Sequence, residues 1–335
     1  MWLRLMHADP EAMPYQSPAW LDSICAMGGY RDVSRFYDFG DGRHYVMPLV
    51  ARSGLASVLN TASSLPPAWG IGGLIGSAAP HVEELSAIFA DLRDLPYQRI
   101  KIRPNPRDGE LWAAAKPNTV LAVPRLAHVL DLEGGFEHVW TKRFSGNTRN
   151  AVRKAEKLGV VTQSDSAGAL LPVFYELLQR SFDRWAAKQN EPRLLTRLRG
   201  GMRDPIEKFQ TIIDKLGEDC RIWAAWVDGR PAAAIFVLQQ HNVNDARGAM
   251  DRALVGSTGA NDLIQKLAIE HAANAGCRYY HMGESGTSSS LALFKARFGA
   301  APYAYAEYII EKLPITRLDA GLRAMVKRVI GFRDN

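Results

Sequence analysis

Short segments of alternating apolar and polar residues are separated along the chain by longer stretches with a helical period, which is typical of an α/β fold. Two Asp-Gly pairs, Asp41-Gly42 and Asp228-Gly229, each separate two apolar runs. Both central residues of a tight hairpin turn need positive φ, which Asp and Gly tolerate. The pattern therefore predicts two β-hairpins, one in each half of the chain.

Similar segments follow the two hairpins. The first hairpin is followed by a Gly-rich loop at 69–76, a helix over 81–95 and a strand over 97–104. The second is followed by a strand over 245–251, a Gly-containing loop at 256–260, a helix over 261–276 and a strand over 277–284. Because the offsets differ, we interpret this as one supersecondary unit present twice, rather than as a sequence repeat.

The second half has additional helical segments. Ser145 and Gly159 bound a predicted helix as its N-cap and C′ residues. Further helices are predicted near 170–188, 204–217 and 288–299, a strand over 304–313, and a basic amphipathic helix in the tail. The resulting domain prediction is an N-terminal domain over 1–135, a C-terminal domain over 136–315 and a C-terminal helix over 316–335.

Composition narrows the protein class. The chain has 335 residues, enough for two cores, and its 47% hydrophobic content is ordinary for a folded protein. No apolar run is long enough for a membrane span and the N-terminus makes a poor signal peptide, so we expect a cytoplasmic protein. The three scattered cysteines predict buried free thiols. No motif predicts a metal site or a bound cofactor.

Charge is distributed unevenly. Residues 1–125 hold 12 Lys/Arg and 12 Asp/Glu, so the net charge of +6 lies entirely in residues 126–335. A basic half favours polyanionic ligands such as phosphates, coenzyme A or RNA, although a solvated basic surface explains the same composition.

Two segments are candidate anion sites. The turn Gly256–Gly259 leads into a helix near Asn261, and a helix N-terminus offers N–H groups to an anion. Arg149 and Arg153 are four residues apart on a basic helix and share a face that could bind a phosphate chain or an RNA backbone. Each feature also has an ordinary structural interpretation, as a plain turn or a solvated helix face.

Two further segments are candidates for the chemistry. Lys295 beside Phe294 could hold a phosphate or a developing oxyanion while the ring stacks on a base. In an α/β sheet ligands lie beyond the carboxyl ends of strands, where His281 or Glu284 could act as a general base, with Asp251 at the preceding strand end as the rival. Taken alone, each of these residues is as well explained by a structural role.

Taken together, these segments resemble the FemAB-like aminoacyltransferases. The stretches that carry the resemblance occur in order along nearly the whole chain: YQSPAWL, SSLPPAWGIGG, FSGNTRNAVRKAEKLGV and GCRYYHMGESGTSSSLALFKARFGA. The resemblance implies an α/β fold of two tandem GNAT-like domains with mixed sheets, whose C-terminal helix can pack on the first domain. It also implies transfer of an acyl or aminoacyl group to an amine.

The resemblance suggests roles for particular residues. Phe294 and Lys295 match the family's pair near the 3′ end of the aminoacyl-tRNA donor, where the Lys assists the transition state. Arg184 and Arg193 fall where basic residues help hold the acceptor's phosphates, and we place His281 on the acceptor side with them. Muramyl-peptide-binding members carry a Lys shortly after the Trp of the entry segment, whereas no Lys follows Trp20 closely. A muramyl-peptide acceptor is therefore not our first expectation.

Three functions remain open at this point. The first is aminoacyl transfer from aminoacyl-tRNA to a small-molecule or peptide amine, with Lys295, Glu284 or Asp251 as catalytic residues. The second is an acyl-CoA-dependent GNAT N-acyltransferase, for which Gly256, Gly259 and Asn261 would hold the donor. The third is a catalytically inactive RNA- or anion-binding protein. No DNA partner is expected, and membrane contact through the basic tail is the weaker interpretation of that helix.

Overall fold

The computed structural model describes residues 1–54, 60–189, 192–314 and 316, and it divides the chain into two units. The first comprises Met1–Ala127 and most of strand β14 (Ala301–Glu311), and the second comprises His128–Ala301. These limits differ from the predicted ones because β14 pairs antiparallel with β7 of the first unit, with Tyr308 opposite Ile102. The predicted C-terminal helix over 316–335 lies outside the described residues, apart from Thr316.

The first unit contains short strands and two longer helices. Its elements are α1 (Trp2–Ala8), α2 (Pro18–Ala26), β1 (Tyr30–Asp32), β2 (Arg35–Asp38), β3 (His44–Met47), β4 (Val50–Arg52), β5 (Thr61–Ser63), β6 (Ile75–Gly76), α3 (Val82–Asp94), β7 (Arg99–Ile102), α4 (Gly109–Ala115) and β14. Strands β1, β4, β5, β7 and β14 follow one another in one sheet, and β2, β3 and β6 form another. Phe89 and Trp112 pack against Tyr308 at the centre of its core.

The second unit is built on a larger sheet. Strand β8 (Leu121–Asp131) leads into this unit. The elements that follow are α5 (Gly135–His138), a π-helical turn (Val139–Arg143), α6 (Gly146–Lys157), β9 (Val161–Asp165), α7 (Leu171–Gln189), α8 (Arg193–Arg203), α9 (Ile206–Leu216), β10 (Cys220–Val227), β11 (Arg230–Gln239), β12 (Val243–Met250), α10 (Arg252–Thr258), α11 (Ala260–Asn274), β13 (Tyr279–Glu284) and α12 (Ser289–Ala296). The strand order is β13-β12-β11-β10-β9.

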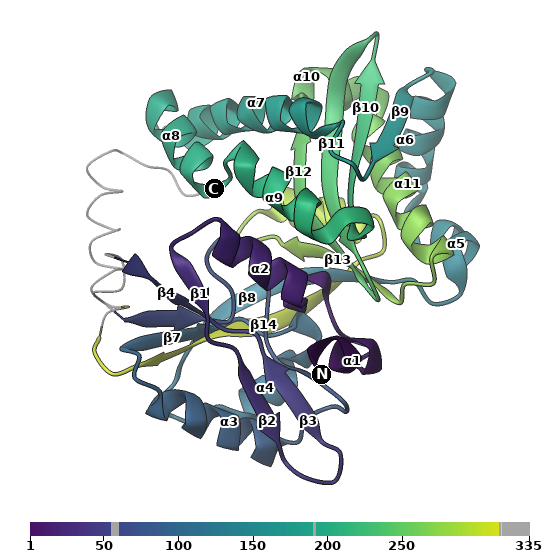
Figure 1. Cartoon of the computed structure of the whole chain (residues 1–335). Coiled ribbons are helices and arrows are strands. Elements are labelled where there is room, and N and C mark those ends of the chain that lie inside the picture. The colour runs from purple at the N-terminus through teal and green to yellow at the C-terminus, as the bar shows by residue number, and fades with distance from the viewer. Residues whose placement is uncertain (55–59, 190–191, 315, 317–335) are drawn as a thin grey trace. The chain divides into compact units, whose positions relative to one another are not determined.

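Alternating side chains on β11 fix the two faces of this sheet. Ile235 and Val237 belong to the core that includes Ile264 of α11. Phe236, which points to the opposite face, packs against Phe174 of α7 and Phe209 of α9. Because successive side chains of a strand point to opposite faces, α11 covers one face while α7 and α9 cover the other (Figure 1).

The hairpin and cap signals read from the sequence are confirmed. Asp41 and Asp228 have φ of 50° and 49°, and the following glycines also have positive φ. Val227 pairs with Arg230 across the second turn. The Ser145 hydroxyl accepts from Thr148 N–H at 3.2 Å at the start of α6. Gly159, with φ of 68°, follows the end of that helix.

The repeated unit is only partly similar in the two halves. The hairpin β10–β11 lies in the main sheet of the second unit, whereas β2–β3 forms a sheet with β6. Helix α8, for which the sequence analysis made no prediction, lies between α7 and α9. Among the helices in the described part of the chain, none has the length and hydropathy of a membrane span.

Candidate functional site

Lys295 is held beneath the carboxyl end of strand β13. Ser288 caps α12, its hydroxyl accepting from Leu291 N–H at 3.3 Å, and Lys295 lies in the last turn of this short helix. Its Nζ donates to the carbonyl oxygens of Gly283 at 2.8 Å and Glu284 at 2.7 Å. Gly283 has φ of 72° inside the strand, a conformation that favours glycine. This kink brings two successive carbonyl groups onto one ammonium.

Asp245 is the acidic counterpart of Lys295. It lies on β12, one residue beyond the position where Asn244 pairs with His281 of the parallel strand β13. Burial lowers the pKa of Lys295 to about 8, while the Asp245 and Glu284 carboxylates oppose that shift. Burial likewise raises the pKa of Asp245 to about 6, against the Lys295 charge and a hydrogen bond from Gln265. An ammonium and a carboxylate therefore coexist near neutral pH.

Neutral polar groups surround this pair. The Gln265 amide donates to the Tyr280 hydroxyl at 3.0 Å, and burial raises the pKa of Tyr280 well above its ordinary value. His128 Nδ1 lies 3.0 Å from Ser285 Oγ, with both side chains buried. Burial and the Lys295 charge lower the pKa of His128. The result is a buried polar cluster around the Lys295 ammonium.

The predicted residues around Lys295 have distinct positions. Glu284 contacts Lys295 through its backbone carbonyl, and its carboxylate acts on the lysine by charge. His281 is buried within strand β13. Phe294 is half-buried and packs edge-on against Phe298, with the Arg297 guanidinium 4.9 Å above its ring. The ring therefore anchors α12.

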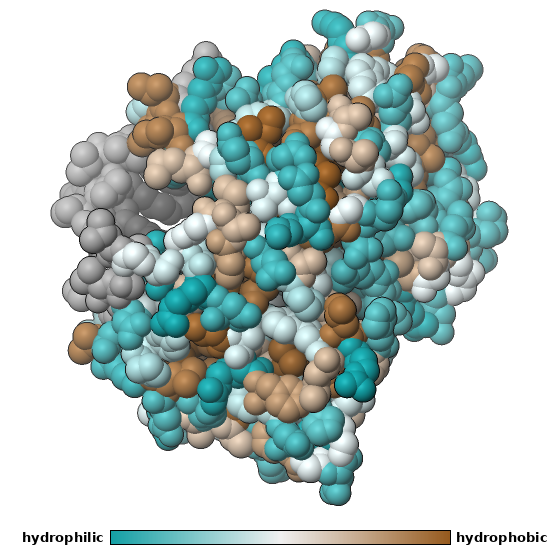
Figure 2. Space-filling model, viewed as in Figure 1, coloured by the Kyte–Doolittle hydropathy of each residue, from teal (hydrophilic) through white to brown (hydrophobic). Residues whose placement is uncertain are grey.

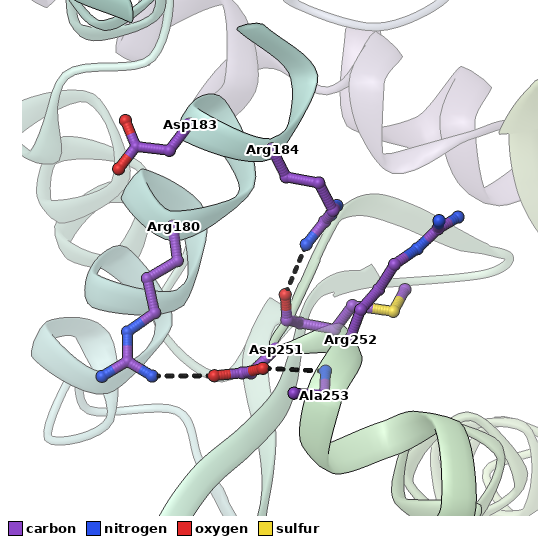
Figure 3. A pocket seen from close by; sticks show the side chains of 7 residues that line it. Arg180, Asp183, Arg184, Asp251, Arg252 and Ala253 are labelled. Atoms are coloured by element: carbon purple, nitrogen blue, oxygen red, sulfur yellow. Dashed lines mark hydrogen bonds and ion pairs between the residues drawn. The ribbon is translucent and has the colours of Figure 1, made fainter. Parts of the chain in front are cut away.

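Asp251 and Arg184 lie at the other end of β12, around a hollow of about 390 Å³ (Figure 3). Asp251 caps α10, accepting from Ala253 N–H at 3.0 Å, and forms an ion pair with Arg180 at 3.1 Å. Arg184 donates to the Met250 carbonyl at 2.7 Å. Burial lowers the pKa of Arg184, as does the neighbouring Arg252 charge. The hollow is thus lined by three arginines and two aspartates, and Asp251 is already paired.

The predicted anion loop is not a loop. Gly256 lies within helix α10, which continues to Thr258. Gly259, with φ of 74°, separates α10 from α11, and a Cβ there would lie 2.4 Å from the Ala151 carbonyl oxygen. Asn261 is buried in the first turn of α11. The glycine therefore allows α11 to approach α6 closely, and the expectation of a loop beginning at Gly256 was wrong because helical bonding continues to Thr258.

The two arginines of α6 are directed at their own unit. Arg149 Nη1 donates to the carbonyls of Trp140 and Thr141 at 3.3 Å, and to that of Phe144. The Arg153 guanidinium lies 5.9 Å from the centre of the Trp140 ring. Both therefore hold the π-helical turn that precedes α6. Arg193 begins α8, and its side chain lies outside the described part of the structure.

Asp245, His128 and Ser285 are not among the residues predicted from the sequence. The signal available for Asp245 was a charged residue within a predicted strand. Its proximity to Lys295 arises only when the chain folds, because Lys295 lies on helix α12, far along the sequence. Within the described residues, no three His, Cys, Asp or Glu side chains form a group suited to a metal ion.

Comparison with known proteins bears on the fold of the second unit. Residues 142–303 match the family model described as an acetyltransferase (GNAT) domain. This segment is therefore similar to GNAT acetyltransferase domains. It contains Asp245, Lys295 and the strand end between them, whereas His128 of the polar cluster precedes the matched segment. A search of curated protein sequences found no significant match.

Solved structures extend the likeness over both units. A crystal structure of FemX has a TM-score of 0.68 at 13% identity, covering 94% of this chain and 96% of that one. The C-terminal domain (DUF2156) of a putative lysylphosphatidylglycerol synthetase from Agrobacterium fabrum has a TM-score of 0.51 at 15% identity, covering 99% and 97%. The predicted resemblance and the fold class of two tandem GNAT-like units are confirmed by the fold.

Proposed function

We propose that this protein transfers an aminoacyl group from aminoacyl-tRNA to an amine acceptor, with Lys295 stabilising the transition state. The observation that carries the proposal is the fixed ammonium of Lys295. Two of its three N–H donors are taken by the Gly283 and Glu284 carbonyls. These are its acceptors among the described residues, which leaves the third donor for a substrate carbonyl.

The reaction needs no covalent enzyme intermediate. The acceptor amine attacks the ester carbonyl of the donor, forming a C–N bond and a negatively charged oxygen that the Lys295 ammonium stabilises. The C–O bond of the ester then breaks, and the released hydroxyl takes up the proton that the amine loses. Because Asp245 is ionised beside Lys295, it favours the protonated form of the lysine that this role requires.

Three features favour aminoacyl-tRNA over acyl-CoA as donor. The segment expected to cradle a coenzyme A pyrophosphate is helical at Gly256, which removes the loop on which that alternative rested. The net charge of +6 in residues 126–335 suits a polynucleotide carrier. The A. fabrum structure, named for a lysyl-bearing product, also supports an aminoacyl group as the unit transferred.

The acceptor's anionic group belongs at the hollow lined by Arg180, Arg184 and Arg252. The hollow also contains the carboxylates of Asp183 and Asp251, which are paired with Arg197 and Arg180. The Arg252 charge lowers the pKa of Arg184, and a bound anion would relieve the repulsion between them. An acceptor that carries phosphate or carboxylate together with a free amine fits this combination.

The test is transfer of radiolabel to acceptor pools that contain no RNA, from charged bulk tRNA and from acetyl-CoA in parallel. We expect ribonuclease-sensitive transfer from tRNA, and a loss of about 100-fold or more with Lys295→Met. Lys266→Met is the matched control, because Lys266 is bound to Glu270 at 2.8 Å and is outside the polar cluster. It should retain near-full transfer.

Other outcomes identify the alternatives. Transfer from the thioester alone would make the protein an acyl-CoA-dependent N-acyltransferase and remove the tRNA donor. Near-full turnover by Lys295→Met would exclude the lysine from the transition state. Tight RNA binding without transfer to any amine would favour an inactive RNA-binding protein.

A further inference from the structure

Helix α8 presents an apolar stripe to solvent. Leu194, Leu198 and Met202 recur every four residues and have exposed fractions of 81%, 60% and 78%. Leu195, beside them, is 40% exposed. Residues four apart lie on one face of a helix, so these side chains form a single strip along α8. Figure 2 shows hydrophobic atoms gathered over the part of the surface where Figure 1 places α8.

The opposite face of α8 fixes its orientation. Thr196 is buried, and Gly200, four residues later, lies against Phe182 of α7, where a Cβ would be 2.8 Å from the ring. Thr196 and Leu198 are about 200° apart around the helix axis. The helix is therefore attached to α7 by its small residues, and its large apolar side chains are directed away from the unit.

The charge of α8 indicates what this stripe meets. The segment 193–203 contains four arginines and no acidic residue. Arg197 pairs with Asp183 beside the stripe, whereas Arg203 donates to the buried Asp204 and is directed toward the unit. Arg199 adds a third cation one residue beyond Leu198. A basic helix with one exposed apolar face is suited to lie in the interface of an anionic bilayer, with its arginines at the headgroups.

We propose that α8 docks this protein on an anionic membrane surface. The inference concerns residues outside the Lys295 cluster and does not depend on the proposed aminoacyl transfer. RNA would be attracted by the same arginines, but it offers nothing to cover three large aliphatic side chains. Membrane insertion of Leu194, Leu198 and Met202 accounts for the stripe and the arginines together.

Co-sedimentation of the full chain with lipid vesicles tests the docking. The vesicles contain phosphatidylcholine alone, or phosphatidylcholine and phosphatidylglycerol at about two to one. We expect binding to the anionic vesicles at about 0.1 M salt, with little binding to phosphatidylcholine alone. The double variant Leu198→Ser, Met202→Ser should lower the partition coefficient about tenfold. Arg199→Gln should lower it about fivefold.

Leu158→Ser is the matched control, since Leu158 is 57% exposed at the end of α6 and lies on another helix. It should bind the anionic vesicles as the parent does. Circular dichroism and urea midpoints establish that all variants are folded. The proposal is overturned if the double variant binds as well as the parent, or if Leu158→Ser loses as much. It also fails if the stripe variant changes only RNA binding or only self-association.

Discussion

At the scale of single residues, the candidate site depends on a balance of burial and charge around one lysine. The position of Lys295 next to an aromatic residue was visible in the sequence, and the structure adds the two carbonyls that hold it. Asp245 could not be recognised in the same way, because it lies 50 residues earlier in the chain on a different strand. The local sequence shows which residue types are present, whereas the neighbouring charge that shifts the pKa of Lys295 is brought close by the tertiary fold.

The coupling of Asp245 and Lys295 predicts a shift in pH dependence. Asp245 raises the pKa of Lys295 from the value that burial alone would give, so Asp245→Asn should lower it further. If protonated Lys295 is needed, transfer falls as pH rises through its pKa, about 8 in the parent. We expect the basic limb of the kcat/KM profile to move down by about one pH unit in the variant.

The comparison uses one acceptor throughout, so that titration of the acceptor amine affects all profiles alike. Asp251→Asn is the control, because it makes the same chemical change at the other end of β12 and should leave the limb in place. An unchanged limb in Asp245→Asn would mean that the lysine does not set the alkaline loss of activity.

At the scale of secondary-structure elements, the sequence was informative where a local rule determines the conformation. The Asp228-Gly229 turn and the Ser145 cap follow from φ preferences and hydrogen-bonding capacity, and the structure has them where they were expected. The segment around Gly256 was different. Glycine predicts a turn by its backbone freedom, but helical hydrogen bonds continue to Thr258 and only Gly259 takes positive φ.

The two glycines should therefore respond differently to a methyl group. Gly259→Ala introduces a Cβ 2.4 Å from the Ala151 carbonyl oxygen at a φ of 74°, and should reduce the free energy of unfolding by about 2–4 kcal/mol. Gly256→Ala has open space and a helical backbone, and should raise it by about 0.5–1 kcal/mol. Urea unfolding curves measure both.

The same two substitutions test whether the segment around Gly256 binds the donor. Because Gly256 lies in a helix, its substitution should leave transfer activity unchanged. A Gly256→Ala variant that is stable and yet fails to use its donor would restore the anion-binding role first expected for this segment. A Gly259→Ala variant as stable as the parent would contradict the close approach of α11 to α6.

At the scale of the whole molecule, the order of elements was easier to predict than their long-range pairing. The tandem α/β organisation follows from hairpins and helical runs that each occupy a short window. Strand β14 pairs with β7, which precedes it by some two hundred residues, and no local pattern predicts that pairing. Buried titratable groups are likewise a property of the whole fold, and they make its stability depend on pH.

Two buried lysines should make the protein more stable as pH rises above neutral. Burial lowers the pKa of Lys208 to about 7 and that of Lys295 to about 8, whereas an unfolded lysine titrates near 10.5. Between these values the unfolded chain binds more protons, so the free energy of unfolding increases with pH. The increase is at most about 1.4 kcal/mol per pH unit for each lysine.

Groups with raised pKa values reverse this trend at higher pH. Burial raises the pKa of Cys277 to about 11 and that of Tyr45 to about 12, so the unfolded chain loses these protons first and the folded state loses stability. Urea unfolding between pH 7 and pH 11 should therefore show a maximum near pH 9–10. Lys295→Met should reduce the rising slope between pH 8 and the maximum, because it removes one of the two titrations. A steady decrease in stability from pH 7 upward would show instead that both lysines remain protonated in the folded protein.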